Sequence, residues 1–215
     1  MPYEKELETA RAAASLAGNR AAAHQRAGVA PETKPDGSPV TIADRENERL
    51  IAGMLEDAFP LDGLVGEEGS RKESRSGRRW IVDPIDGTRD FLRGNPLWSV
   101  LIGLEVDGNA VAGVAHLPML GQTYFAGRGA GAWRVAGTGG APERLHVSGI
   151  DAPESAVLCV NGLNRVGREA FGPRLVEWMD RFWSVRSLGG AMDAMLVAAG
   201  QAELWIERRA EIWDL

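Results

Sequence analysis

The stretch WIVDPIDGT (residues 80–88) places two carboxylates directly after an apolar strand. Residues 80–83 form the compact strand, and a proline separates Asp83 from Asp86. Because proline fixes φ and has no amide hydrogen, it blocks continuation of the strand and predicts a sharp turn. Such a turn lets both carboxylates point at one place, together with the main-chain carbonyl of Ile85. The stretch therefore predicts a site with several oxygen ligands.

Two further acidic residues follow other predicted elements. Glu67 ends a short buried strand at residues 64–65, and Asp214 lies near the end of the chain. Together with Asp83 and Asp86 they form an oxygen-only ligand set, which favours Mg²⁺ or Mn²⁺ over zinc. Like charges a few ångströms apart cannot all stay ionised. Two bridged divalent ions would relieve this repulsion and supply two-metal hydrolytic chemistry.

The residues after the second aspartate are typical of a phosphate-binding turn. Gly87 allows a close approach, and a short helical turn follows over residues 89–92. Exposed amides at a helix start are a natural phosphate cradle. The hydroxyl of Thr88 is a candidate for orienting the attacking water.

Each candidate also has a purely structural interpretation. Both aspartates of the stretch could be ordinary turn residues, since Asp and Gly are common in turns. The Glu67-Glu68 pair, taken alone, is typical of a solvated surface. Asp44, at the start of a predicted helix, is either the acidic member of a capping pattern or a hydrogen-bond partner of Thr88.

Composition argues against several classes of protein. The chain has 215 residues, 44% of them hydrophobic, a net charge of −6 and no basic stripe of the kind that binds nucleic acid. The N-terminus carries Glu4, Glu6 and Glu8 and lacks the apolar core of a signal peptide. No run approaches the ~18 apolar residues of a membrane helix. We therefore expect a cytoplasmic protein without membrane contact, whose single Cys159 is a buried structural thiol.

The order of helical and strand patterns predicts a mixed α/β fold. A proline- and glycine-rich loop is expected over residues 28–39, and a hairpin turn at residues 107–109. Runs of strands with helices on several faces predict a layered mixed α/β sandwich. Helices are expected over residues 3–26, 41–59, 167–181 and 190–200, and strands over 64–65, 80–83, 98–106, 110–116, 123–126, 132–135, 156–160, 183–187 and 202–207.

Three segments together resemble one known family. Glu67-Glu68 after a glycine, WIVDPIDGTRDF (80–91) and Trp213-Asp214 resemble the inositol monophosphatase family of Mg²⁺-dependent, lithium-sensitive phosphatases. The resemblance runs through essentially the whole chain, and a DPIDGT segment after a GEE segment is highly specific. It implies an αβαβα sandwich of the sugar-phosphatase type and a homodimer. It also implies a single domain of two tightly joined halves, about 1–140 and 141–215.

The resemblance also implies a role for each candidate residue. Glu67, Asp83 and the Ile85 carbonyl would hold a first Mg²⁺, and Glu67 would help to place a third, weaker ion, with Mn²⁺ able to substitute. The residues implied to hold the second ion are Asp83, Asp86 and Asp214. The catalytic residues implied are Glu67, Thr88 and Asp44. The residues implied to bind phosphate and substrate are Asp86, Gly87, Thr88, Gly189, Gly190, Ala191 and Glu207.

Two stretches are closer to the histidinol-phosphate phosphatase branch of this family than to the inositol branch. They are residues 38–51 and 90–105, the latter with a similar F-(hydrophobic)-R-G-x-P-L-W run. In that branch the residue before the phenylalanine is usually serine, whereas here it is Asp90. Histidinol phosphate and inositol 1-phosphate therefore both stay open as small phosphorylated substrates.

The family motif normally continues after Trp-Asp into a small-residue helix, a glycine turn and final strands. This chain stops at Leu215. If those elements are absent, Asp214 would sit on a frayed terminus and one sheet edge would be unprotected. A competing hypothesis is a regulatory interaction protein of the same fold with little or no phosphatase activity, since some bacterial relatives are associated with transcription machinery.

Overall fold

The computed structural model of the chain describes residues 2–137, 139–207 and 210–214. They divide into two compact units, one of residues 2–137, 139–144 and 211–214, and the other of residues 145–207 and 210. The division falls after residue 144. Residues 211–214, however, belong with the first unit rather than with the second.

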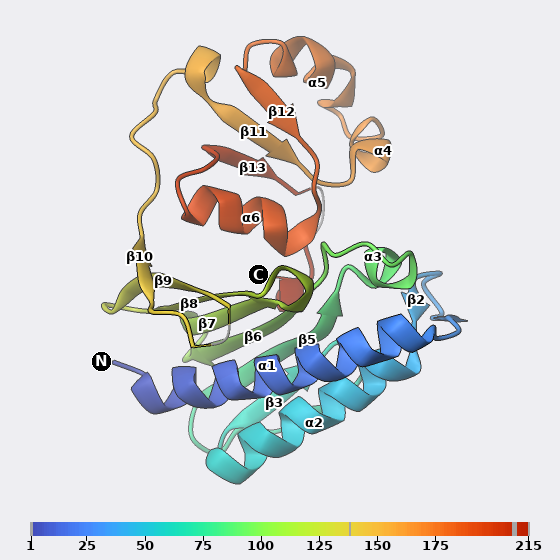
Figure 1. Cartoon of the computed structure of the whole chain (residues 1–215), viewed down its shortest axis with the longest axis vertical. Coiled ribbons are helices and arrows are strands. Elements are labelled where there is room, and N and C mark those ends of the chain that lie inside the picture. The colour runs from blue at the N-terminus through green and yellow to red at the C-terminus, as the bar shows by residue number, and fades with distance from the viewer. Residues whose placement is uncertain (1, 138, 208–209, 215) are drawn as a thin grey trace. The chain divides into compact units, whose positions relative to one another are not determined.

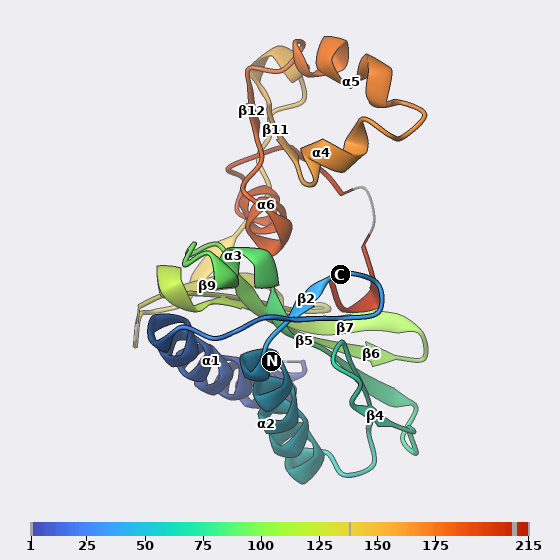
Figure 2. The same cartoon turned by 90° about the vertical axis from the view of Figure 1, so that its right-hand side faces the viewer.

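Two long helices lie side by side on one face of the first unit's sheet (Figures 1 and 2). They are α1 (Glu4–Ala27) and α2 (Ile42–Ala58), and both expected helices are confirmed. The buried face of α1 consists mainly of alanine at helical spacing, which lets the helix approach its neighbours closely. Gly18 continues this face, because a Cβ there would overlap the ring of His116 on the sheet.

The sheet of the first unit has the order β10-β9-β8-β7-β6-β5-β3-β4. Strands β3 and β5 are parallel, whereas the pairs from β5 to β9 are antiparallel. The hairpin turn between β6 and β7 is confirmed, and its Asp107 and Gly108 both have positive φ, 50° and 78°. The strands are β3 (Gly63–Gly66), β4 (Arg71–Lys72), β5 (Arg78–Asp86), β6 (Ser99–Val106), β7 (Asn109–Leu117), β8 (Gln122–Gly127), β9 (Gly131–Ala136) and β10 (Glu143–Leu145).

Strand β5 does not end in a sharp turn at Pro84, so that prediction is wrong. The strand runs on to Asp86 and stays paired with β6 on both sides of the proline, with a register shift between Asp83 and Asp86. Such a bulge accommodates a residue that cannot donate to the ladder. The next amide, of Ile85, donates to Oδ1 of Asp83 at 2.9 Å instead.

Several short elements complete the first unit. The expected loop at 28–39 contains a small antiparallel pair, β1 (Glu32–Thr33) with β2 (Pro39–Val40). Helix α3 (Thr88–Leu92) follows β5, and a 3-10 turn, η1 (Pro118–Leu120), follows β7. The C-terminal 3-10 turn η3 (Ile212–Asp214) packs against β5 and β6.

The second unit is a three-stranded parallel sheet with helices. Strand β11 (Val157–Val160) lies between β12 (Ser184–Arg186) and β13 (Leu204–Ile206). The helix expected over 167–181 is present but shorter, since it begins at Gly172 next to a proline and ends at Met179; a separate short helix precedes it and ends at Val166. The remaining elements are η2 (Pro153–Ser155), α4 (Leu163–Val166), α5 (Gly172–Met179) and α6 (Gly190–Ala198).

The cores agree with the expected mixed α/β class. The core of the first unit contains Trp80 and Val82 of β5, Trp98 just before β6, and the buried alanines of α1. In the second, α4 and α5 pack on β11 around Leu158. Cys159 on the same strand is buried and free, as predicted. Among the helices in the described part of the chain, none is long and apolar enough to cross a bilayer.

Candidate active site

Three predicted carboxylates meet at the end of β5. One oxygen each of Asp83, Asp86 and Asp214 lies within 4.8 Å of the others, an arrangement that could hold a metal ion. Asp83 and Asp86 flank the bulge in β5, which redirects the strand between them. Oδ2 of Asp86 also accepts a hydrogen bond from the Ser99 hydroxyl at 3.1 Å.

Asp214 reaches this cluster from the other end of the chain in a defined turn. Its Oδ2 accepts the amide of Glu211 at 2.7 Å, and its own amide donates to the Glu211 carbonyl at 3.1 Å. The turn η3 packs on β5 and β6. The structure therefore places Asp214 against the sheet, not at the frayed end that the sequence suggested.

Asp83 is the most buried member of the cluster, with 2% of its surface exposed. Burial raises its pKa well above the usual range of an aspartate, and the nearby charges of Glu67, Asp86 and Asp214 raise it further. Burial and the nearby like charges disfavour the ionised form of this carboxyl group, and a bound cation would favour it. The donor set is made of oxygens alone, which suits a hard divalent ion.

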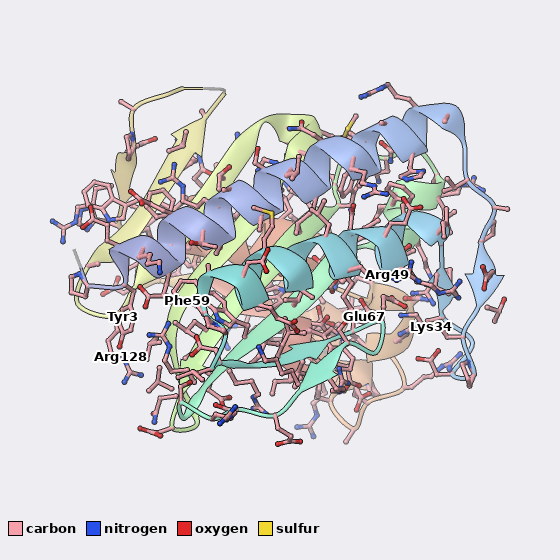
Figure 3. The ribbon with its side chains drawn as sticks, turned by 90° about the horizontal axis from the view of Figure 1, so that it is seen from below. Tyr3, Lys34, Arg49, Phe59, Glu67 and Arg128 are labelled. Carbon is pink, nitrogen blue, oxygen red and sulfur yellow. The ribbon has the colours of Figure 1, made fainter. Side chains whose placement is uncertain are left out.

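Glu67 lies beside Asp83 in the loop after β3, and a lysine already contacts it. Nζ of Lys34 lies 2.7 Å from Oε1 of Glu67 and 2.6 Å from Oε1 of Glu68 (Figure 3). Burial raises the pKa of Glu68 to about 7 in spite of this lysine. Burial lowers the pKa of Lys34, but the hydrogen bonds that Lys34 donates to both glutamates and their charges outweigh it, and the pKa is raised. Sequence reasoning missed Lys34, since the loop over 28–39 gave no signal beyond its turn residues.

Both interpretations of Asp44 are met at once. Its Oδ2 accepts the amide and the hydroxyl of Thr41, at 2.7 and 2.5 Å, which completes the capping box of α2. Its Oδ1 lies 3.4 Å from Oγ1 of Thr88, which donates to it. The same hydroxyl lies 3.3 Å from the carbonyl oxygen of Ile85, so its one proton has two acceptors. Burial raises the pKa of Asp44, and its hydrogen bonds to Thr41 oppose that shift.

The turn that follows has the backbone that its glycine predicts. Gly87 caps α3 with φ 89°, a conformation that other residues rarely adopt. Asp90 in the same helix accepts the side-chain amide of Asn95 at 2.7 Å through its carboxylate. Its backbone carbonyl accepts the Asn95 amide at 2.9 Å. Asp90, which stands where serine is usual in the histidinol-phosphate phosphatase branch, is thus half-buried, and its carboxylate closes the loop after α3.

The four remaining candidates lie in the second unit. Gly189, Gly190 and Ala191 begin α6, and the Gly189 amide donates to Oδ2 of the buried Asp193 at 3.1 Å. Glu207 follows β13 and accepts the side-chain amide of Asn161 at 2.5 Å. Gly189, Gly190 and Ala191 therefore lie together at the start of α6. Glu207 follows β13, which is an edge strand of the sheet in this unit.

One known family matches almost the whole chain. The family model described as "Inositol monophosphatase family" matches residues 3–215. The chain belongs to the inositol monophosphatase family. A histidinol-phosphatase of Mycobacterium tuberculosis is 40% identical over 184 residues, which is 86% of this chain and 70% of the relative. An inositol-1-monophosphatase of Mesorhizobium japonicum is 38% identical over 188 residues, 85% of this chain and 68% of the relative.

Solved structures place this family member in the same fold. The crystal structure of the extragenic suppressor protein suhB of Bartonella henselae superposes with a TM-score of 0.89 at 30% identity, over 99% of this chain and 81% of that one. The layered α/β fold of the sugar-phosphatase type and the assignment to the phosphoric monoester hydrolases are both confirmed.

Proposed function

We propose that this member of the inositol monophosphatase family hydrolyses the phosphate monoester of a small polar metabolite in a Mg²⁺-dependent reaction. The observation that carries the proposal is the convergence of Asp83, Asp86 and Asp214, with Glu67 beside them. Glu67, Asp83 and the Ile85 carbonyl would hold one ion, and the three aspartates a second. Bound ions would supply Lewis-acid stabilisation of the phosphoryl and leaving oxygens.

The residues of the chain itself would orient the water and the phosphate. Asp44 accepts a hydrogen bond from the Thr88 hydroxyl, which leaves an oxygen lone pair of Thr88 free to accept a hydrogen bond from the attacking water. The capping bonds fix Asp44 in place, so one of the two acceptors of the Thr88 hydroxyl has a fixed position. The amides of Gly87 and Thr88 would bind the phosphate. Asp86 is proposed to contact both an ion and the substrate.

For the substrate we propose histidinol phosphate first and inositol 1-phosphate second. Several similar proteins are named histidinol-phosphatase and others inositol-1-monophosphatase, at comparable identity. Gly189, Gly190, Ala191 and Glu207 would contact the part of the substrate beyond the phosphate. Homodimerisation and a cytoplasmic location remain predictions from the sequence.

The test is phosphate release from a panel of monoesters. Histidinol phosphate, inositol 1-phosphate, fructose 1,6-bisphosphate, 3′-phosphoadenosine 5′-phosphate and a nucleoside monophosphate are each supplied with Mg²⁺, with Mn²⁺, and with EDTA. We expect turnover of one or two of them, dependent on the metal. Metal-independent turnover would refute the proposed chemistry. No turnover of any substrate, together with a stable protein partner in a pull-down, would support the regulatory alternative.

A further inference from the structure

A buried glutamate on α2 is bonded to the loop that presents Glu67. Glu48 is 2% exposed and lies in the middle of the helix. Its Oε2 accepts the amide of Glu68 at 2.6 Å, and its Oε1 accepts the amide of Ser70 at 2.7 Å. Both donor–acceptor distances are short for N–H···O hydrogen bonds. The Glu48 carboxylate therefore holds the main chain at Glu68, directly after the candidate metal ligand Glu67, and at Ser70.

The amides of this loop are all paired, and Glu48 supplies two of the five acceptors. Gly66 donates to the Ser70 carbonyl at 2.9 Å, Glu67 to the Val82 carbonyl at 3.1 Å and Gly69 to the Gly66 carbonyl at 3.4 Å. The remaining two amides, of residues 68 and 70, are the ones that Glu48 accepts. Glu48 therefore holds the main chain at the tip of the loop, where Gly69 makes only a long bond, while Lys34 contacts the side chains of Glu67 and Glu68.

The glycine before Glu67 has a steric reason that involves the same carboxylate. A Cβ built on Gly66 would overlap the carboxylate group of Glu48, and the nearest atoms around it all belong to that side chain. Gly66 does not have positive φ, so its backbone would accept alanine. The absence of a side chain at residue 66 is thus what lets Glu48 reach the loop.

We infer that Glu48 is a positioning residue for the metal site: it holds residues 66–70 so that the Glu67 carboxylate faces Asp83. The effect on metal binding rests on the proposed function, in which Glu67 is a metal ligand. Outer groups that orient ligands typically change metal affinity about 10- to 100-fold when removed. Glutamine at position 48 keeps the shape but turns an NH₂ group toward one of the two amide donors.

The first experiment measures the loop and the metal separately in Glu48→Gln. Amide hydrogen exchange by NMR, without metal, should show faster exchange at Glu68, at Ser70 or at both. Mn²⁺ binding, followed by electron paramagnetic resonance without substrate, should weaken about tenfold. Glu46→Gln is the matched control, since Glu46 lies on the same helix but pairs with Arg20 and His24. The control should bind Mn²⁺ like the wild type.

A second variant covers the case in which Glu48→Gln does not fold. Gly66→Ala should displace the Glu48 carboxylate and also weaken Mn²⁺ binding. In Glu48→Ala that carboxylate is already absent, so adding Gly66→Ala should weaken Mn²⁺ binding little further than Glu48→Ala alone. Normal Mn²⁺ binding and normal exchange in both single variants would overturn the inference, as would full additivity in the double variant. Failure of the wild type to bind Mn²⁺ at all would instead overturn the proposed function.

Discussion

Replacing Asp83 by asparagine should stabilise the metal-free protein while it destroys the metal site. The amide oxygen of asparagine can still accept the Ile85 amide, so the bulge in β5 keeps its internal hydrogen bond. The amide nitrogen can donate to Glu67, whose charge now opposes ionisation of Asp83. The substitution therefore removes one buried negative charge and leaves the local geometry intact.

The size of the effect follows from the spacing of the carboxylates. The oxygens of Asp83, Asp86 and Asp214 lie within 4.8 Å of one another. At that separation, and at an effective dielectric constant near 20, two unit charges repel by about 3.5 kcal/mol. Proton uptake relieves part of this repulsion, since the pKa of Asp83 is raised. We therefore expect the free energy of unfolding to rise by about 1–2 kcal/mol, and Tm by about 2–8 °C.

Thermal unfolding with EDTA and with excess Mg²⁺ checks this expectation. At Mg²⁺ near 100 times its Kd, the wild type should gain about 2.7 kcal/mol, or about 5–11 °C in Tm. Asp83→Asn should gain almost nothing and should lose phosphatase turnover by orders of magnitude. The two proteins should therefore exchange order of stability when Mg²⁺ is added. A variant that melts below the wild type in EDTA and still responds fully to Mg²⁺ would refute the reasoning.

Three further outcomes are expected. Thr88→Ala should lower kcat about 10²- to 10⁴-fold, whereas Thr88→Ser, which keeps the hydroxyl, should retain most of it; equal losses would contradict a role for the hydroxyl. Asp62→Asn should lower the free energy of unfolding by about 1.5–3 kcal/mol in urea titration, because Asp62 accepts hydrogen bonds from Arg78 and Trp80 at the start of β5. Its kcat should stay unchanged, and a loss of Mg²⁺ binding there would show that the two ends of β5 are coupled. Cys159 should not react with Ellman's reagent at pH 8 until the protein is unfolded, because burial raises its pKa to about 12; rapid reaction of the native protein would show that the strand opens.

Much of the site could be predicted because it is encoded in short stretches of sequence. The motif around Asp83 and Asp86 joins an apolar strand to a glycine turn, and both features persist in the structure. The two long helices were predictable from their periodicity and from the capping residues at Thr41 and Asp44. What failed was the local effect of Pro84, since the sequence shows the missing amide but not the neighbouring strand that keeps β5 paired.

The roles of Lys34 and Glu48 were not predictable, because neither residue belongs to a recognised motif and a single sequence does not record its partners. Lys34 is 33 residues from Glu67 and Glu48 is 22 residues from Ser70, yet each pair is in hydrogen-bond contact. In the sequence, Glu48 is an ordinary glutamate in a helix rich in charges. Its burial, at 2% exposure, distinguishes it from exposed glutamates such as Glu56 on the same helix.

Helix α2 carries residues that contact two parts of the candidate site, the Thr88 hydroxyl and the loop of Glu67. Asp44 and Glu48 are four residues apart, so they lie on one face of the helix, one turn from each other. Asp44 accepts a hydrogen bond from the hydroxyl of Thr88, and Glu48 accepts one from the loop that carries Glu67. A small shift of α2 along the sheet would therefore move the group proposed to orient the water and a proposed metal ligand together. The close alanine packing between α1 and its neighbours restrains such a shift, which gives the apolar layer beneath the sheet a direct part in the geometry of the site.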